Sequence, residues 1–238
     1  MAKDLGVIVG RLREEIEKTE EIRAAVLYGS AVGGEYLPGR SDLNVLLIAN
    51  EITTPLLDDL QKEMKSWRKM GITAPLLVDR PFLVSSTDSY PLEILGMLAG
   101  YQVLKGVDPF DGLMPRKEHV RLQAEREIKG KALLLRRAYL ESQGNHGRLL
   151  AYLVQVVPAF EAILRGMLFL RDADWRKSGP ALHEACRDLV AMDPDLPREL
   201  REARLGRERP DRHATIRLYG RTFEVLRWLD RETERAAE

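Results

Sequence analysis

The stretch that decides the fold is AVLYGSAVGGEYLPGRSDLNVLLIAN, residues 25–50. Its first four residues, Ala25–Tyr28, are short and apolar, which predicts one buried strand. Gly29 and Ser30 end that strand, because glycine lets the backbone turn sharply and approach a ligand closely. Turn-forming residues then predict an irregular loop: Gly33, Gly34, Pro38 and Gly39.

A second apolar run begins directly after this loop, and we predict a strand over residues 42–49. Successive side chains of a strand point to opposite faces of a sheet. Asp42 and Asn44 should therefore share one face, while Leu43 and Val45 enter the core. The turn and the two polar side chains are expected to meet at one end of the sheet.

This arrangement resembles the signature of the polymerase-beta-like nucleotidyltransferases, in which a Gly-Ser turn and a loop precede Asp-x-Asp at the start of a strand. Gly29, Ser30 and Asp42 match that signature, but the second aspartate is replaced by Asn44. In the family, the two aspartates hold Mg²⁺ ions that bridge the phosphates of a nucleoside triphosphate. The resemblance implies that Gly29, Ser30 and Ser41 contact a nucleotide, ATP first among them, and that Asp42 binds Mg²⁺.

The family also needs a third carboxylate, on a strand beside the one that carries Asp-x-Asp. We predict a strand over residues 91–95, with Glu93 as its one charged residue. The segment YPLEIL resembles the corresponding segment of the streptomycin/spectinomycin adenylyltransferases, which implies that Glu93 is the third metal ligand. Asp79 and Asp88 are rivals for this role. A salt bridge to an arginine would equally explain a carboxylate inside an apolar strand.

Asn44 bears directly on catalysis. Asp42 and Glu93 supply two carboxylates, whereas Asp-x-Asp with Glu93 would supply three. A neutral amide is a weaker ligand for a hard cation such as Mg²⁺. The loss of transition-state charge stabilisation typically lowers a rate by orders of magnitude. The residues therefore fit either a weakened transferase with catalytic positions at Asp42, Asn44 and Glu93, or a nucleotide-binding descendant without transfer.

A transferase needs a general base for the acceptor hydroxyl. In the adenylyltransferases a glutamate of the second domain has this role, which makes Glu161 and Glu125 the candidates here. An ion pair between Glu161 and Arg165, one helical turn apart, is the alternative for Glu161.

Composition restricts the class of protein. The chain has 238 residues, of which 45% are hydrophobic and 31% charged, as expected of a globular protein with a substantial core. Its single cysteine, Cys186, excludes an internal disulfide framework and fits a cytoplasmic location. We find no uninterrupted apolar window long enough for a membrane span. Residues 1–114 carry 12 basic and 17 acidic residues out of 37 of each, so the first half is acidic and the second basic.

The expected fold class is α+β, with a nucleotidyltransferase-type domain at 1–113 and a helical bundle at 114–238. Further strands are predicted at 74–78 and 101–104. A kink is expected at Pro158, which removes one backbone N–H from its helix. Helical spacing and turn residues predict helices at about 3–22, 54–70, 116–142, 146–170, 178–191, 196–206 and 211–235.

Three functions remain open on these residues. The first is Mg²⁺-dependent transfer of a nucleoside monophosphate to a hydroxyl on a small molecule or a protein. The second is nucleotide binding or regulation without transfer, including a toxin–antitoxin-like role suggested by the spacing of Arg207 and His213. The third is an interaction protein in which 146–170 contributes to a homodimer. The tryptophans are scattered in the sequence, which argues against a stacking platform for nucleic acid.

Overall fold

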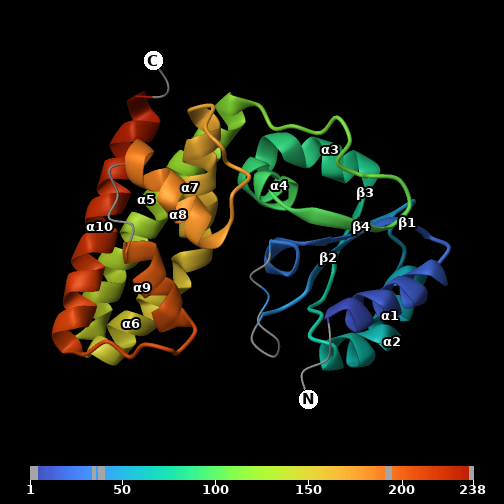
Figure 1. Ribbon diagram of the computed structural model, residues 1–238, viewed down its shortest axis with the longest axis horizontal. Helices are drawn as coiled ribbons and strands as arrows, with labels where there is room; N and C mark the ends of the chain where they lie inside the picture. The colour runs from blue at the N-terminus through green and yellow to red at the C-terminus, as the bar shows by residue number, and fades with distance from the viewer. Residues whose placement is uncertain (1–4, 34–35, 37–40, 191–194, 236–238) are drawn as a thin grey trace. The chain divides into compact units, whose positions relative to one another are not determined.

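The computed structural model describes residues 5–33, 36, 41–190 and 195–235 (Figure 1). The chain divides into two compact units, Met1–Thr87 with Gly96–Met114, and Asp88–Leu95 with Pro115–Glu238. The first contains the sheet and the second is helical, so the predicted α+β class is confirmed. The domain limits 1–113 and 114–238 stay a prediction, and they differ from this division at residues 88–95.

The first unit is built on a four-stranded sheet in the order β3-β2-β1-β4. Its central strands are β1 (Ile22–Tyr28) and β2 (Asn44–Ala49), which run antiparallel. Strand β4 (Tyr101–Lys105) pairs antiparallel with β1, and β3 (Leu76–Asp79) pairs parallel with β2. All four predicted strands of this sheet are therefore present, with no end shifted by more than three residues.

Both faces of the sheet are covered. Helices α1 (Leu5–Glu17) and α2 (Thr54–Lys69) lie on one face, and α3 (Arg80–Ser89) lies on the other (Figure 1). This explains why β1 and β2 are buried along nearly their whole length. The main core of this unit includes residues from α1, β1, β2 and α2: Ile8, Leu12, Ile16, Ala25, Leu27, Val45, Leu47, Leu56, Leu60 and Trp67.

Helix α2 has the ends that its sequence predicts. The side chain of Thr53 accepts a hydrogen bond from the Leu56 N–H at 3.3 Å, and Pro55 lies in the first turn, where its missing N–H costs nothing. Gly71 follows the helix with φ of +83°, a left-handed conformation that favours glycine. The long helix links β2 to its parallel neighbour β3.

The second unit is a bundle of α5 (Lys117–Ser142), α6 (His146–Gln155), α7 (Val157–Leu170), α8 (Gly179–Val190), α9 (Asp195–Arg204) and α10 (Arg212–Arg235). The helix predicted over 146–170 is two helices, α6 and α7, bent by 42°. Pro158 lies in the first turn of α7, so the kink expected there is a complete break. No single described helix is long and apolar enough to cross a membrane. The α6–α7 pair meets the length and composition, but α7 is largely buried in the bundle.

The strand predicted over 91–95 is wrong, because this segment begins helix α4 (Pro91–Leu98). Proline is well suited to the first turn of a helix, and the acidic Glu93 in that turn interacts favourably with the helix dipole. Residues 85–88, whose sequence Ser-Ser-Thr-Asp predicts a turn or a helix cap, likewise lie inside α3. Both segments are short, and hydrophobic periodicity alone does not show whether their helix-start residues begin a helix.

Gln123 of α5 holds the start of α4. Its Oε1 accepts a hydrogen bond from the Leu92 N–H at 2.8 Å, and its Nε2 donates to Glu93 Oε2 at 2.7 Å. The first N–H groups of a helix lack intrahelical partners, so a buried side-chain acceptor there replaces water. Gln123 and Leu92 are both buried. The amide of Gln123 therefore fixes α4 against α5.

Replacing Gln123 by leucine should lower the free energy of unfolding by about 1–3 kcal/mol, because the buried Leu92 N–H loses its acceptor. Urea denaturation measures this difference. Gln155→Leu, an exposed glutamine at the end of α6, is the matched control and should change stability by less than about 0.5 kcal/mol. Equal stability of the two variants would show that the Gln123 bond does not hold α4.

Candidate functional site

The Gly-Ser turn closes tightly after β1. Gly29 has φ of +81°, and its N–H donates to the Gly100 carbonyl at 3.4 Å. The Gly29 carbonyl accepts from the N–H groups of Val32 and Gly33 at 3.0 and 3.1 Å, which closes the short helix Gly29–Ala31. The turn is thus fixed by the backbone. Gly34, Pro38 and Gly39 of the predicted loop lie outside the described residues.

Asn44 lies directly against this turn. Tyr28 and Asn44 are paired in the β1–β2 register, and Tyr28 also pairs with Tyr101 of β4. A Cβ atom added to Gly29 would lie 3.2 Å from Asn44 Nδ2. A Cβ at position 29 would therefore be in tight contact with the amide of Asn44, and the positive φ favours glycine there.

Asp42 and its neighbours alternate as predicted. Leu43 and Val45 are fully buried, Asp42 is exposed and Asn44 is half-buried. The Leu43 N–H donates to the Gly71 carbonyl at 2.9 Å, so this part of the chain is held although β2 itself begins at Asn44 and not at Asp42. The structure thus brings Gly29 and Asn44 together, with Asp42 two residues before Asn44 on the open end of the sheet.

No strand beside Asn44 supplies a carboxylate among the described residues. On one side lies Tyr28, and on the other the segment Thr73–Pro75 precedes β3. Asp79 pairs with Ala49 at the opposite end of β2, and its Oδ1 accepts from the Phe82 N–H at 2.7 Å. Asp79 is therefore explained as the N-terminal cap of α3.

Asp88 lies on the exposed side of α3, and Glu93 lies on an exposed side of α4 in the helical unit. The prediction that Glu93 is a carboxylate inside an apolar strand is wrong, because its side chain is exposed to solvent and accepts a hydrogen bond from Gln123. The role of Glu93 as a metal ligand stays a prediction. Within the described parts of the chain, no three His, Cys, Asp or Glu side chains form a metal-binding group.

The donor set at the sheet end fits one Mg²⁺ ion and not two. Mg²⁺ is commonly held by one or two carboxylates together with substrate phosphates. Asp42 offers one exposed carboxylate for this purpose. Asn44 offers only a neutral amide oxygen, which is a weaker ligand for a hard cation than a carboxylate, so a second ion would be poorly held.

Glu161 faces a different partner from the one expected. Its Oε1 lies 3.7 Å from Nε2 of the buried His183 on α8. The Arg165 guanidinium instead donates to the carbonyls of Trp175 and Lys177 at 2.6 and 2.8 Å. The predicted Glu161–Arg165 ion pair is thus wrong, and Glu161 links α7 to α8. Its role as a general base stays a prediction.

Glu161 should make stability depend on pH. Burial raises the pKa of Glu161, but His183, Arg201 and Arg204 together outweigh burial and hold the pKa below its ordinary value. A carboxylate with a lowered folded-state pKa adds stability above the unfolded pKa of about 4.3 and loses it as pH falls through the folded pKa. The stability advantage of wild type over Glu161→Gln should therefore be largest near neutral pH and shrink below about pH 4.

Urea denaturation of both proteins across that range measures this difference. Glu224→Gln, an exposed glutamate on α10, should show no such pH-dependent gap. A gap between wild type and Glu161→Gln that stays constant with pH would rule out the charge as its cause.

Glu125, the other candidate base, belongs to an ion-pair network. It accepts from Arg121 at 2.9 Å and from Lys129 at 2.7 Å, and Lys129 also contacts Asp230 of α10 at 3.1 Å. Lys129 lowers the pKa of Glu125 through their hydrogen bond, opposed by desolvation. A lowered pKa makes a weaker base, so these residues are better explained as a link between α5 and α10.

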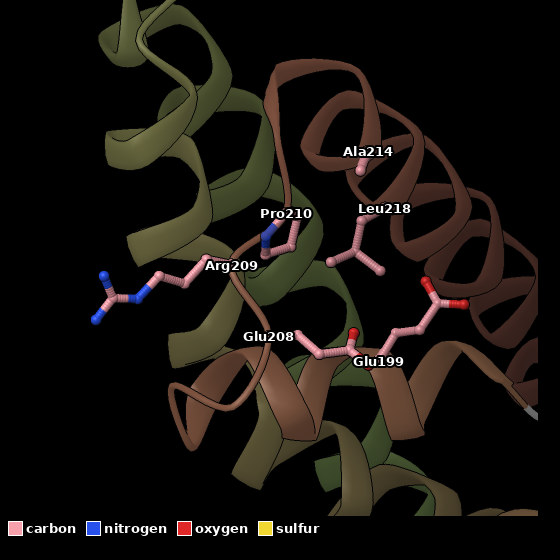
Figure 2. A pocket seen from close by; sticks show the side chains of 6 residues that line it. All are labelled: Glu199, Glu208, Arg209, Pro210, Ala214 and Leu218. Atoms are coloured by element: carbon pink, nitrogen blue, oxygen red, sulfur yellow. The ribbon is translucent and has the colours of Figure 1, made fainter.

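A pocket of about 270 Å³ lies in the helical unit, and no predicted site residue lines it (Figure 2). Figure 2 shows Glu199 and Glu208 side by side at its lower edge, with Arg209 extending away from it. Glu199 is paired with Arg221 at 2.8 Å. Apolar atoms of Pro210, Ala214 and Leu218 form the rest of the lining. The charge of Glu199 is thus already compensated, and the pocket does not provide a phosphate site.

The whole chain can be compared with known proteins. No protein-family model and no curated protein sequence matches it. Among solved structures, it matches the spectinomycin adenyltransferase AAD(9) from Enterococcus faecialis, which was crystallised with ATP and spectinomycin. The match covers 95% of this chain and 99% of that chain, with a TM-score of 0.51 and 12% sequence identity.

The fold is that of a nucleotidyltransferase. The resemblance of residues 25–50 to the polymerase-beta-like enzymes is therefore confirmed as a likeness of fold. At 12% identity the likeness extends to the arrangement of the elements alone, and the Asp-x-Asn motif stays an interpretation of the sequence.

Two neighbours of the site were not singled out from the sequence. Tyr28 and Tyr101 lie on adjacent strands in register with Asn44, and burial raises the pKa of the Tyr28 phenol. The position of Tyr28 was accessible to prediction, because a hairpin between the two strands places the residue before Gly29 opposite the start of β2. The position of Tyr101 depends on a strand pairing that no local pattern records.

Proposed function

We propose that the end of the sheet at Gly29, Ser30, Ser41, Asp42 and Asn44 binds a nucleoside triphosphate with one Mg²⁺ ion. The position of the Asn44 amide beside the Gly29 turn carries this proposal, because it places a polar side chain next to a glycine whose backbone a phosphate can approach closely. Mg²⁺ bound by Asp42 and the phosphates would neutralise part of their charge. ATP is the first candidate, since AAD(9) was crystallised with ATP.

We further propose that the chain transfers a nucleoside monophosphate to a hydroxyl acceptor at a reduced rate. In this reaction the acceptor oxygen attacks the α-phosphorus, pyrophosphate leaves and a base takes the hydroxyl proton. The likeness of fold to AAD(9) supports transfer, and the acceptor would be a small molecule or a protein. Asn44 supports the reduced rate, because an amide would hold Mg²⁺ less well than a carboxylate, and a held Mg²⁺ stabilises the developing negative charge.

A regulatory role without transfer is the second candidate function. This role is favoured because, among the described residues, no strand neighbouring Asn44 carries a second carboxylate that could hold Mg²⁺ for transfer. In such a protein the nucleotide would be a ligand that stabilises one state of the chain, and the same sheet end would bind it.

Thermal unfolding of the wild type with each Mg-NTP tests binding. A nucleotide at ten times its Kd stabilises the folded state by about 1.4 kcal/mol, which raises the melting temperature by roughly 3–6 °C for a chain of this size. Incubation with labelled NTPs then tests transfer through the release of pyrophosphate. Binding with slow pyrophosphate release supports the weakened transferase. Binding without release favours the regulatory role, and no shift with any NTP contradicts both.

A further inference from the structure

Asn44 places a hydrogen-bond donor where the signature of the fold has a metal ligand. Its Nδ2 lies over the Gly29 turn, and among the described residues its side chain forms no hydrogen bond. The group is half-buried, so part of it remains open to a ligand. The amide nitrogen can donate two hydrogen bonds, and the neutral amide oxygen is a weaker ligand for Mg²⁺ than a carboxylate.

The charge at the sheet end is also unusually low for a site that handles metal-bound phosphates. Among the described residues, the strand positions that flank Asn44 add no carboxylate to Asp42, since Asp79 lies at the far end of β2. Two carboxylates would repel a polyphosphate strongly unless Mg²⁺ stood between them. With Asn44, half of this repulsion is absent and an N–H group that attracts phosphate oxygen takes its place.

We infer that Asn44 donates a hydrogen bond directly to a phosphate oxygen, so that this site binds a polyphosphate without requiring a divalent cation. This inference rests on the proposed function, since it concerns the same site. The alternative is a purely structural amide that fills the space beside Gly29. The two alternatives can be told apart by the affinity for ATP in the absence of Mg²⁺. Only if Asn44 donates a hydrogen bond to phosphate should this affinity depend on its N–H group.

Isothermal titration of ATP into the full chain, once with Mg²⁺ and once with EDTA, tests the inference. Sodium tripolyphosphate in EDTA is a second probe that lacks the nucleoside. Wild type should bind ATP in EDTA within about tenfold of its affinity with Mg²⁺. Asn44→Asp should lose about tenfold or more in EDTA and recover with Mg²⁺, because the added carboxylate repels bare phosphates and binds the ion.

Asn44→Ala separates the donor from the charge. It keeps the site neutral but removes the N–H group, so it should also bind ATP more weakly in EDTA, by about fivefold to tenfold for one lost charge-assisted hydrogen bond. Urea denaturation without ligand verifies that both variants fold.

Three other results would contradict the donor role, the metal-free binding or the proposed function. Wild-type affinity of Asn44→Ala in EDTA would overturn the donor role. Strict dependence of wild-type binding on Mg²⁺ would overturn the inference and leave the proposed function intact. Failure of ATP to bind under either condition would remove the proposed function, and the inference with it.

Discussion

Asp42→Ala is expected to remove most of the stabilisation of the chain by MgATP. Asp42 is exposed, and the strand positions beside Asn44 carry no second carboxylate among the described residues, so no adjacent strand residue replaces it as the Mg²⁺ ligand. Binding without a held Mg²⁺ is up to about tenfold weaker, so the rise in melting temperature with MgATP should fall from roughly 3–6 °C to roughly 1–2 °C at ten times the wild-type Kd. Thermal unfolding with and without MgATP measures the effect.

The ligand-free stability of Asp42→Ala should stay within about 0.5 kcal/mol of wild type, because an exposed side chain is removed. Asp111→Ala is the matched control, since Asp111 is an exposed aspartate of the same unit. It should keep the full response to MgATP. An undiminished response in Asp42→Ala would place the metal, or the nucleotide itself, elsewhere in the chain.

Gly106→Ala is expected to have the largest effect on stability. Gly106 follows β4 with φ of +75°, and an added Cβ would lie 2.0 Å from the Arg23 carbonyl oxygen. Because that atom belongs to the backbone of β1, relief requires β4 to move away from β1. The left-handed conformation costs about 1–2 kcal/mol and such overpacking about 1–3 kcal/mol, so we expect a loss of about 2–5 kcal/mol.

Gly112→Ala distinguishes the clash from the backbone conformation. Gly112 has φ of +68°, and an added Cβ there would meet no atom within 4 Å. This variant should lose only the conformational cost of about 1–2 kcal/mol. Urea denaturation compares the two. Equal losses would show that the contact with Arg23 relaxes freely and that the β1–β4 pairing at this point is not tight.

The part of the fold that is local in sequence could be predicted. The two central strands, the turn at Gly29 and the alternation from Asp42 to Val45 follow from glycine conformations and from period-two burial. Helix α2 could be placed because its cap, proline and closing glycine are adjacent to it. The long helices of the second unit follow from helical spacing and prolines, although the kink expected at Pro158 is a break between two helices.

The parts that failed depend on distant contacts. The segment at Glu93 is short and apolar, and such a run fits a strand or a buried helix equally well by periodicity. The helix is held in part by the hydrogen bond that Gln123, thirty residues further along the chain, donates to Glu93. Glu161 and Arg165 are one turn apart, yet His183 and two backbone carbonyls are their partners. Local spacing does not contain this information.

Titration of the isotope-labelled chain with MgATP, followed by NMR, tests nucleotide binding at the sheet end most directly. The backbone amides of Gly29 and Ser30 and the side-chain amide of Asn44 should shift in a saturable manner. The amides of Ala214 and Leu218, which line the pocket of the helical unit, should not shift. Saturable shifts at Ala214 and Leu218 with unchanged signals from Gly29, Ser30 and Asn44 would contradict the account.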